Sequence, residues 1–102
     1  MQIPVLEDIV EYLGKEIIPS TEIDSLGLYD PDTLRIFYNP IKIQSKDEFI
    51  LTILHEIIHR IDLYEELDNN QTELLAEYLS ANKQIRTTIR KHFKTELKRY
   101  KY

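Results

Sequence analysis

The segment at residues 46–64 constrains the fold of this chain more than any other segment. Its apolar residues recur at helical spacing and form a stripe that is wide enough to indicate a buried helix. The residues of this stripe are Phe49, Ile50, Ile53, Leu54, Ile57, Ile58 and Ile61. Ser45 and Glu48 match a capping box and predict that the helix begins near residue 46. We therefore expect one buried helix with the rest of the chain packed around it.

The segments before this helix predict an α+β fold. Pro4 and the apolar residues that follow it indicate a helix from residue 4 to about residue 17, or only as far as Gly14. Apolar runs at residues 26–29 and 34–38 flank a turn with Pro31 at its second position, which predicts a β-hairpin. Residues 41–43 are interpreted as a short extension of the sheet.

Two further helices are expected after a polar turn at residues 65–70. Asn70, Gln71 or Thr72 can cap the first of them. The second has apolar residues at every fourth position, a narrow stripe that favours docking on a surface over burial in the middle of the fold. These residues are Ile85, Ile89, Phe93 and Leu97. The expected layout is an N-terminal helix, a small hairpin-based sheet, the buried helix, a glutamate-bearing helix and a C-terminal helix.

Length and composition indicate one domain, residues 1–102, without thiol chemistry. The 102 residues are enough for a single hydrophobic core, and none is cysteine. The lack of cysteine excludes disulfides, thiolate zinc fingers, iron–sulfur sites and a thiol nucleophile. The first residues contain neither a basic region nor a long apolar run, so we expect no signal peptide, no membrane partner and a cytoplasmic location.

Three ionisable residues interrupt the apolar helix in the pattern His55-Glu56-x-x-His59. Residues four apart lie one helical turn from each other, so both imidazoles can reach one metal ion. Glu56 lies beside that face and can reach a water molecule near the ion without binding the ion itself. Polar groups against an apolar core are unfavourable unless they are satisfied, which favours a metal site over two core histidines satisfied by other groups.

A catalytic zinc ion needs a third protein ligand and keeps one position for water. Without cysteine, that ligand is His92 or a carboxylate. Glu73 is favoured because it begins the next helix after a short connection, and helices joined in this way lie side by side. Glu77, one turn further on, is the main rival as a ligand; otherwise it is placed to accept the N–H of a metal-bound histidine. Asp62, near His59, could also support a metal-bound histidine, but a pair with Arg60 or with solvent is favoured.

The H-E-x-x-H pattern at residues 55–59, followed by E-x-x-A-E at residues 73–77, resembles the gluzincin metallopeptidases. In that family the second motif reads E-x-x-A-D or E-x-x-x-D, so this chain departs from it at Glu77 and in the short gap between the motifs. With about one hundred residues and a hairpin before the active-site helix, the chain is most similar to the minigluzincins. The small metallopeptidase-like domains that cleave phage and stress-response repressors are close competitors.

This resemblance implies a zinc-dependent endopeptidase that acts on a peptide or protein substrate. His55, His59 and Glu73 would bind Zn²⁺, which lowers the pKa of its water to about 7 and polarises the scissile carbonyl. Glu56 would take the proton from that water and deliver it to the leaving amine. The strand at residues 34–38 would be the sheet edge that receives the peptide, and one of the tyrosines or histidines would stabilise the oxyanion.

Charge is divided unevenly along the chain. Residues 1–78 contain 17 acidic and 5 basic side chains, whereas residues 79–102 contain 1 acidic and 8 basic side chains. Opposite charges this close attract, so we expect the basic segment to lie against an acidic surface of its own chain or of a second chain. Because C-terminal segments keep minigluzincins latent, the resemblance suggests that residues 83–102 cover the zinc cleft, in cis or by exchange within a homodimer.

Two other functions are left open by the sequence. A zinc-bound regulatory or interaction module without hydrolytic activity would keep the metal ligands but would not need Glu56. A nucleic-acid adaptor would use the basic C-terminal segment. The sequence pI of about 5.1 opposes a general phosphate-binding surface, so nucleic acid is not expected as a partner.

Overall fold

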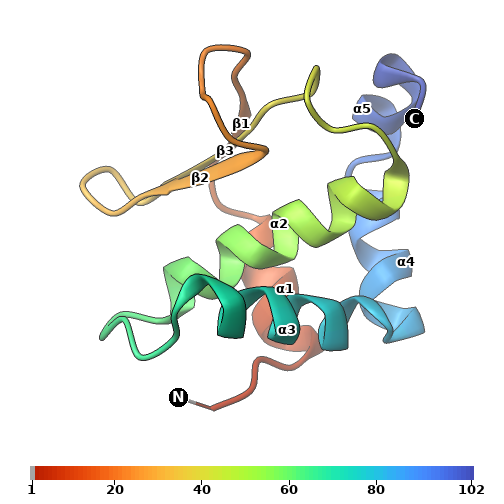
Figure 1. Cartoon of the computed structure of the whole chain (residues 1–102). Coiled ribbons are helices and arrows are strands. Elements are labelled where there is room, and N and C mark those ends of the chain that lie inside the picture. Colours follow the sequence, from red (N-terminus) through yellow and green to blue (C-terminus); the bar gives the residue numbers. More distant parts are fainter. Residues whose placement is uncertain (1) are drawn as a thin grey trace.

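Helix α2 (Lys46–Ile61) lies at the centre of the computed structural model, which describes residues 2–102 (Figure 1). The described chain has five helices and one three-stranded sheet, which confirms the predicted α+β class. The other elements, in chain order, are α1 (Leu6–Leu13), β1 (Ile17–Pro19), β2 (Gly27–Asp30), β3 (Arg35–Tyr38), α3 (Asn69–Ser80), α4 (Lys83–His92) and α5 (Lys94–Tyr100). Among residues 2–102, no helix combines the length and the apolarity that a bilayer span requires.

The predicted hairpin forms, but its second strand is not at the edge of the sheet. The strand order is β1-β3-β2, with β3 parallel to β1 and antiparallel to β2. The prediction that residues 34–38 form a free edge for a peptide is therefore wrong, because β1 and β2 take up both sides of β3. Strand β2 is an edge strand of the sheet, so one of its sides is unpaired. The strand packs against α2.

The first helix is shorter than predicted, and the end of its expected range belongs to the sheet. Helix α1 ends at Leu13, and Ile17 starts strand β1, which pairs with Ile36 of β3. Three residues carry too little pattern to reveal a strand whose order depends on a distant partner. The expected sheet extension at residues 41–43 is also wrong, because the Asn39 side chain accepts the N–H groups of Ile41 and Lys42 and holds a turn there.

Side chains set the start of α2 and both ends of the connection between α2 and α3. Ser45 accepts the N–H of Glu48, as predicted, at the start of α2. Helix α2 ends at Ile61 rather than near residue 64, because the buried Asp62 carboxylate accepts backbone N–H groups of the following loop. Helix α3 is capped by Asp68, not by one of the residues at 70–72.

The C-terminal segment forms two helices where one was predicted, with the break at Phe93. Its narrow apolar stripe packs onto the rest of the protein, as predicted. Ile85, Ile89, Phe93 and Leu97 are each 6 % exposed or less, whereas the residues between them are exposed or half-buried. Phe93 packs edge-on against Phe49, with ring centroids 5.1 Å apart, and both rings contact Tyr38. The tail of the chain therefore belongs to the same hydrophobic core as the first half of α2.

Candidate metal centre and catalytic cleft

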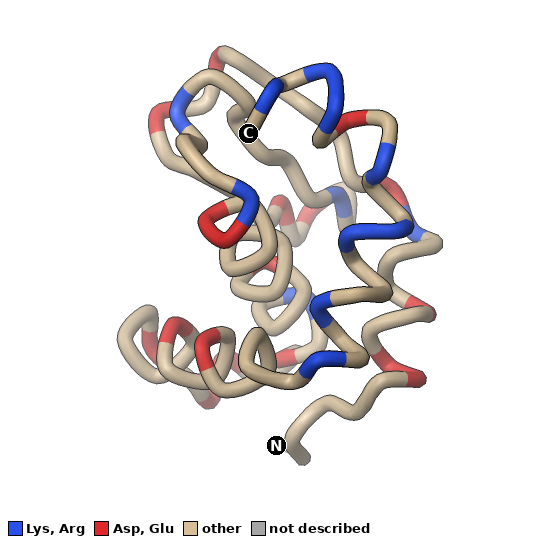
Figure 2. The backbone as a smooth tube through the Cα atoms, turned by 90° about the vertical axis from the view of Figure 1, so that its right-hand side faces the viewer, with Lys and Arg blue, Asp and Glu red and all other residues tan. Residues whose placement is uncertain are grey.

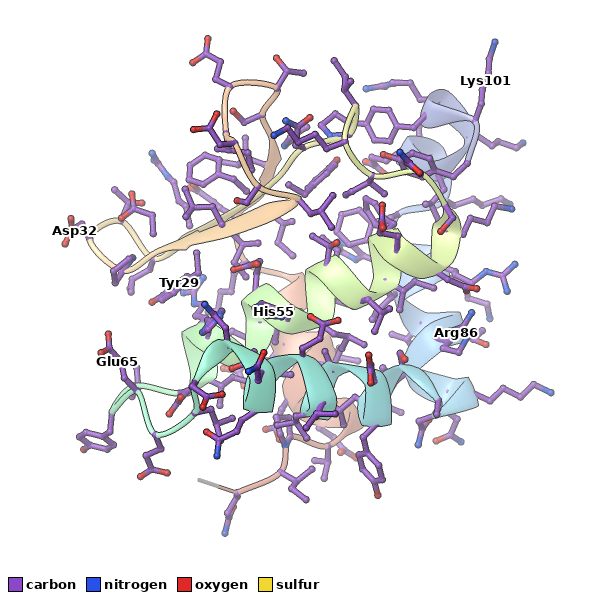
Figure 3. All side chains as sticks on the ribbon, in the orientation of Figure 1. Tyr29, Asp32, His55, Glu65, Arg86 and Lys101 are labelled. Carbon is purple, nitrogen blue, oxygen red and sulfur yellow. The ribbon has the colours of Figure 1, made fainter. Side chains whose placement is uncertain are left out.

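A cleft of about 1170 Å³ lies beside the second half of α2. Strand β2 forms one wall, and the α2–α3 loop and the first turns of α3 form the other. Residues that line it include Gly27, Leu28 and Tyr29 from β2, Thr52, His55, Glu56 and His59 from α2, and Asn69 and Glu73 from α3. The structure thus brings the three predicted metal ligands and the predicted general base to one cleft. Figure 3 shows His55 on α2, with Tyr29 on the strand above it.

The three predicted ligands form a hydrogen-bonded chain. Nδ1 of His55 lies 2.8 Å from Oε2 of Glu73, and Nε2 of His55 lies 3.0 Å from Nε2 of His59. A hydrogen bond between two imidazole nitrogens needs one donor and one acceptor, so the two rings cannot both be fully protonated. A consistent arrangement has His55 donating through Nδ1 to Glu73 and accepting through Nε2 from His59.

His55 therefore stands between the other two side chains, with one ring nitrogen directed to each. The three donor groups touch in sequence and do not surround a common point. Accordingly, residues 2–102 contain no group of three or more His, Cys, Asp or Glu side chains already arranged to hold a metal ion. The kinds of donor are nevertheless those of a catalytic zinc site, two imidazoles and a carboxylate.

Glu56 is a buried carboxyl group on the wall of this cleft. Its side chain is only 7 % exposed. Burial, with a smaller contribution from the charge of Glu73, raises the pKa of Glu56 from 4.5 to about 7, although a backbone hydrogen bond from Tyr29 favours the ionised form. A carboxyl group with such a pKa can both accept and release a proton near neutral pH.

The surroundings of His59 favour its neutral imidazole form. Burial and the neighbouring His55 lower its pKa, and these effects outweigh a hydrogen bond from the side chain of Asn69 and the nearby charges of Asp62 and Glu65. A neutral imidazole is the form that binds metal ions. Asn69 was not identified from the sequence, because its role depends on how the first turn of α3 meets the end of α2.

Gly27 brings β2 close to helix α2, a role that could not be identified from the sequence. A Cβ atom added at Gly27 would lie 2.7 Å from Cγ2 of Thr52 and 3.0 Å from Oε2 of Glu56. Any larger residue would displace one of these side chains. The hairpin pattern around Gly27 was recognisable, but the approach of its strand to α2 is a tertiary feature.

Of the other residues considered from the sequence, Glu77 and His92 lie outside the cleft, whereas Asp62 lines it. Glu77 is exposed and does not line the cleft, since Ala76 is the residue of that turn that is buried. His92 is exposed at the end of α4, with its ring against Phe93. Asp62 holds the α2–α3 loop, and the expected partner Arg60 instead donates to the backbone oxygen of Leu34.

The C-terminal segment does not cover the cleft in cis. The cleft lining includes no residue from 83–102. Helix α4 packs against α1, α2 and α3, and the aromatic residues around α5 pack at the first half of α2. Covering by exchange between two chains stays a prediction.

Comparison with known protein families, curated proteins and solved structures gives no match to this chain.

Proposed function

We propose that this protein is a zinc-dependent peptidase. The observation that carries the proposal is the contact between side chains of two helices in one cleft: His55 and His59 from α2, and Glu73 from α3. These are the donor types that catalytic zinc sites use, and Glu56 lies beside them with its carboxyl group in the same cleft. The resemblance to gluzincins rests on the same residues.

His55, His59 and Glu73 would hold the ion. Binding would exchange their mutual hydrogen bonds for bonds to the metal, and the neutral form of His59 is suited to this. A bound Zn²⁺ supplies a Lewis acid that acidifies water and polarises a carbonyl group. Neither Glu77 nor His92 lines the cleft, which favours Glu73 as the third ligand.

Glu56 would act as the general base and then as the general acid. Its carboxyl group takes a proton from water in the cleft and returns it to the amine of the leaving peptide. The Tyr29 backbone hydrogen bond and the Gly27 contact hold this carboxyl group in place. Both features come from β2, so the strand and the helix build the base together.

Strand β2, not β3, would receive an extended peptide. The backbone N–H of Asn39 donates to the carbonyl of Leu26, so these two residues form a hydrogen-bonded pair. Because such pairs alternate along antiparallel strands, the backbone groups of Gly27 and Tyr29 point away from β3. Gly27 accepts from the Ser25 hydroxyl and Tyr29 donates to Glu56, which agrees with this direction. Tyr29 is also the tyrosine found among the residues that line the cleft, and it is our candidate for stabilising the oxyanion.

The test is hydrolysis of a fluorescence-quenched peptide library by the full chain loaded with one equivalent of Zn²⁺. We expect cleavage that stops when a chelator removes the ion and resumes when zinc is restored. Glu56→Gln should lower kcat/KM by about 10²- to 10⁴-fold without changing the zinc content. The matched control, Glu77→Gln, changes an exposed glutamate on the neighbouring helix and should keep the activity.

A second outcome would favour the zinc-bound module without hydrolytic activity. In that case the zinc-loaded protein would bind one ion but cleave no member of the library, and Glu56→Gln would leave all measured properties unchanged. Such a result would overturn the peptidase proposal and keep the metal site.

A further inference from the structure

A second, smaller groove lies on the C-terminal helices, separate from the cleft. Its volume is about 560 Å³. It is lined by six basic residues, together with Thr87, Leu97 and Tyr102; the basic residues are Lys46, Arg90, Lys91, Lys94, Lys98 and Lys101. No carboxylate is among the lining residues. Figure 2 shows the Lys and Arg positions along these helices. Glu65 lines the cleft, and Figure 3 shows Lys101 on the opposite side of the molecule from it.

The cations of this groove are not neutralised within the described chain. Among residues 2–102, the ion pairs of Lys and Arg side chains are Arg35 with Glu16 and Arg86 with Asp47, and neither arginine lines the groove. The acidic residue of the C-terminal helices, Glu96, has a buried Oε2 atom, so its carboxylate is turned inward. The groove therefore presents a concentrated positive charge to solvent.

The surroundings of the groove argue against an apolar partner. The large apolar side chains that are exposed in the described chain all lie before residue 79, so none is on α4 or α5. Leu97 lines the groove but is only 6 % exposed. A membrane-binding helix would instead present exposed apolar side chains that can enter the lipid.

The negative charge of the whole chain does not cancel this local potential. At physiological ionic strength, charges more than about 8 Å apart are largely screened from each other in solvent. Beside Lys46 in the sequence, Asp47 pairs with Arg86, and Glu48 accepts the backbone N–H of Gln44. The sequence pI opposes nucleic-acid binding, but it averages the charge over the whole chain. Binding depends on the local charge of the groove, where the fold gathers the cations.

We infer that this groove binds the backbone of single-stranded nucleic acid, independently of the proposed peptidase function. Lys94 and Lys98 lie one turn apart on α5, with Lys91 before the break at Phe93 and Lys101 after the helix, so four cations follow one another along the groove. The half-buried Tyr102, whose ring packs against Phe49, forms part of the groove wall. A continuous basic groove is an arrangement that tracks a phosphate backbone. Its small volume suits one strand better than a duplex.

The experiment measures binding of a fluorescein-labelled 20-mer of thymidine to the full chain by anisotropy, from 50 to 300 mM NaCl. We expect binding that weakens linearly in log Kd against log salt, by about 0.7 for each phosphate contact. Lys94→Glu with Lys98→Glu should weaken binding at least about tenfold and lower the salt slope by about 1.4. Lys15→Glu with Lys83→Glu makes the same change in net charge at exposed positions outside the groove and should weaken binding less than threefold.

Four results would overturn the inference. The first is no binding of the oligonucleotide at 50 mM NaCl, and the second is an equal loss of affinity in the two double variants. The third is equal or tighter binding of a duplex or of polyglutamate of matched charge. The fourth is binding to anionic phosphatidylserine vesicles in place of the oligonucleotide. Circular dichroism of both double variants verifies that each is folded.

Discussion

The two halves of α2 have opposite surroundings. Its first half is enclosed by aromatic residues from the sheet and the C-terminal tail, and Phe49 and Ile53 are fully buried there. Its second half faces a cleft with His55 and His59, whose polar groups are satisfied by other side chains of the site. Only one face of this second half is open to the cleft, because Leu54, Ile57 and Ile58 on its other faces are fully buried in the core. A chain of this size can tolerate the unfavourable burial of the Glu56 carboxyl group because that group lies next to a well-packed core.

The largest effect is expected from disrupting the packing of the first half of α2. Phe49→Ala removes a ring that contacts Tyr38, Phe93 and Tyr102 and should lower the free energy of unfolding by about 3–5 kcal/mol. Urea unfolding followed by circular dichroism measures this. Leu74→Ala, at a 66 % exposed position on α3, should change the free energy of unfolding by less than about 0.5 kcal/mol. A small loss for Phe49→Ala would mean that the C-terminal tail does not anchor α2.

Removing the buried charge of Glu56, in the second half of α2, should stabilise the protein. The folded-state pKa of Glu56 is raised to about 7, so between pH 4.5 and 7 the unfolded chain loses its proton first and the stability falls as pH rises. In the metal-free protein at pH 8, Glu56→Gln should therefore raise the free energy of unfolding by about 3 kcal/mol. The gain should shrink steadily as the pH is lowered towards 4.5.

Urea midpoints of the metal-free protein between pH 4.5 and 8 measure this gain. Glu77→Gln serves as the control at an exposed position and should show no gain at any pH. If Glu56→Gln were no more stable than the wild type at pH 8, the carboxyl group would be better solvated than the structure indicates.

A smaller effect on the free energy of unfolding is expected at high pH, from the tyrosines that pack around the first half of α2. Burial, with a hydrogen bond to Tyr100, raises the pKa of Tyr38, and burial raises the pKa of Tyr102 to about 12. The unfolded chain ionises near pH 10 while the folded chain does not, so stability is full below pH 10 and is lost as pH rises above it. Tyr38→Phe should cost about 1 kcal/mol at pH 7, where it removes the hydroxyl contact with Tyr100, and should make the alkaline loss less steep.

Unfolding midpoints between pH 9 and 11.5 test this expectation. Tyr64→Phe changes a tyrosine that is 86 % exposed and should leave the alkaline slope unaltered. An identical slope in wild type and Tyr38→Phe would show that Tyr38 ionises as readily in the folded as in the unfolded chain.

The sequence predicted the features that depend on local spacing. Helix α2, its Ser45 cap and the hairpin all follow from residues that are near each other in the chain. The contact of His55 with His59 follows from their separation of one turn, and that of His55 with Glu73 from the short connection between two helices. These are the parts of the site in which local geometry leaves few alternatives.

The features that the sequence did not predict depend on tertiary packing. Strand β1 becomes a strand only because β3 offers it a partner, and the break at Phe93 lets the tail pack on Phe49. The surroundings of Glu56 likewise come from β2, through Gly27 and the backbone of Tyr29. The periodicity of the C-terminal stripe predicted that one face would pack, but it did not identify the surface that this face packs against.

The central claim is that His55, His59 and Glu73 form one metal site. Isothermal titration of the metal-free full chain with Zn²⁺ tests it most directly, in wild type, Glu73→Ala and Glu77→Ala. The account predicts one ion per wild-type chain, unchanged binding in Glu77→Ala, and at least about tenfold weaker binding in Glu73→Ala. Equal affinity and stoichiometry in all three proteins, or no zinc binding by the wild type, would contradict it.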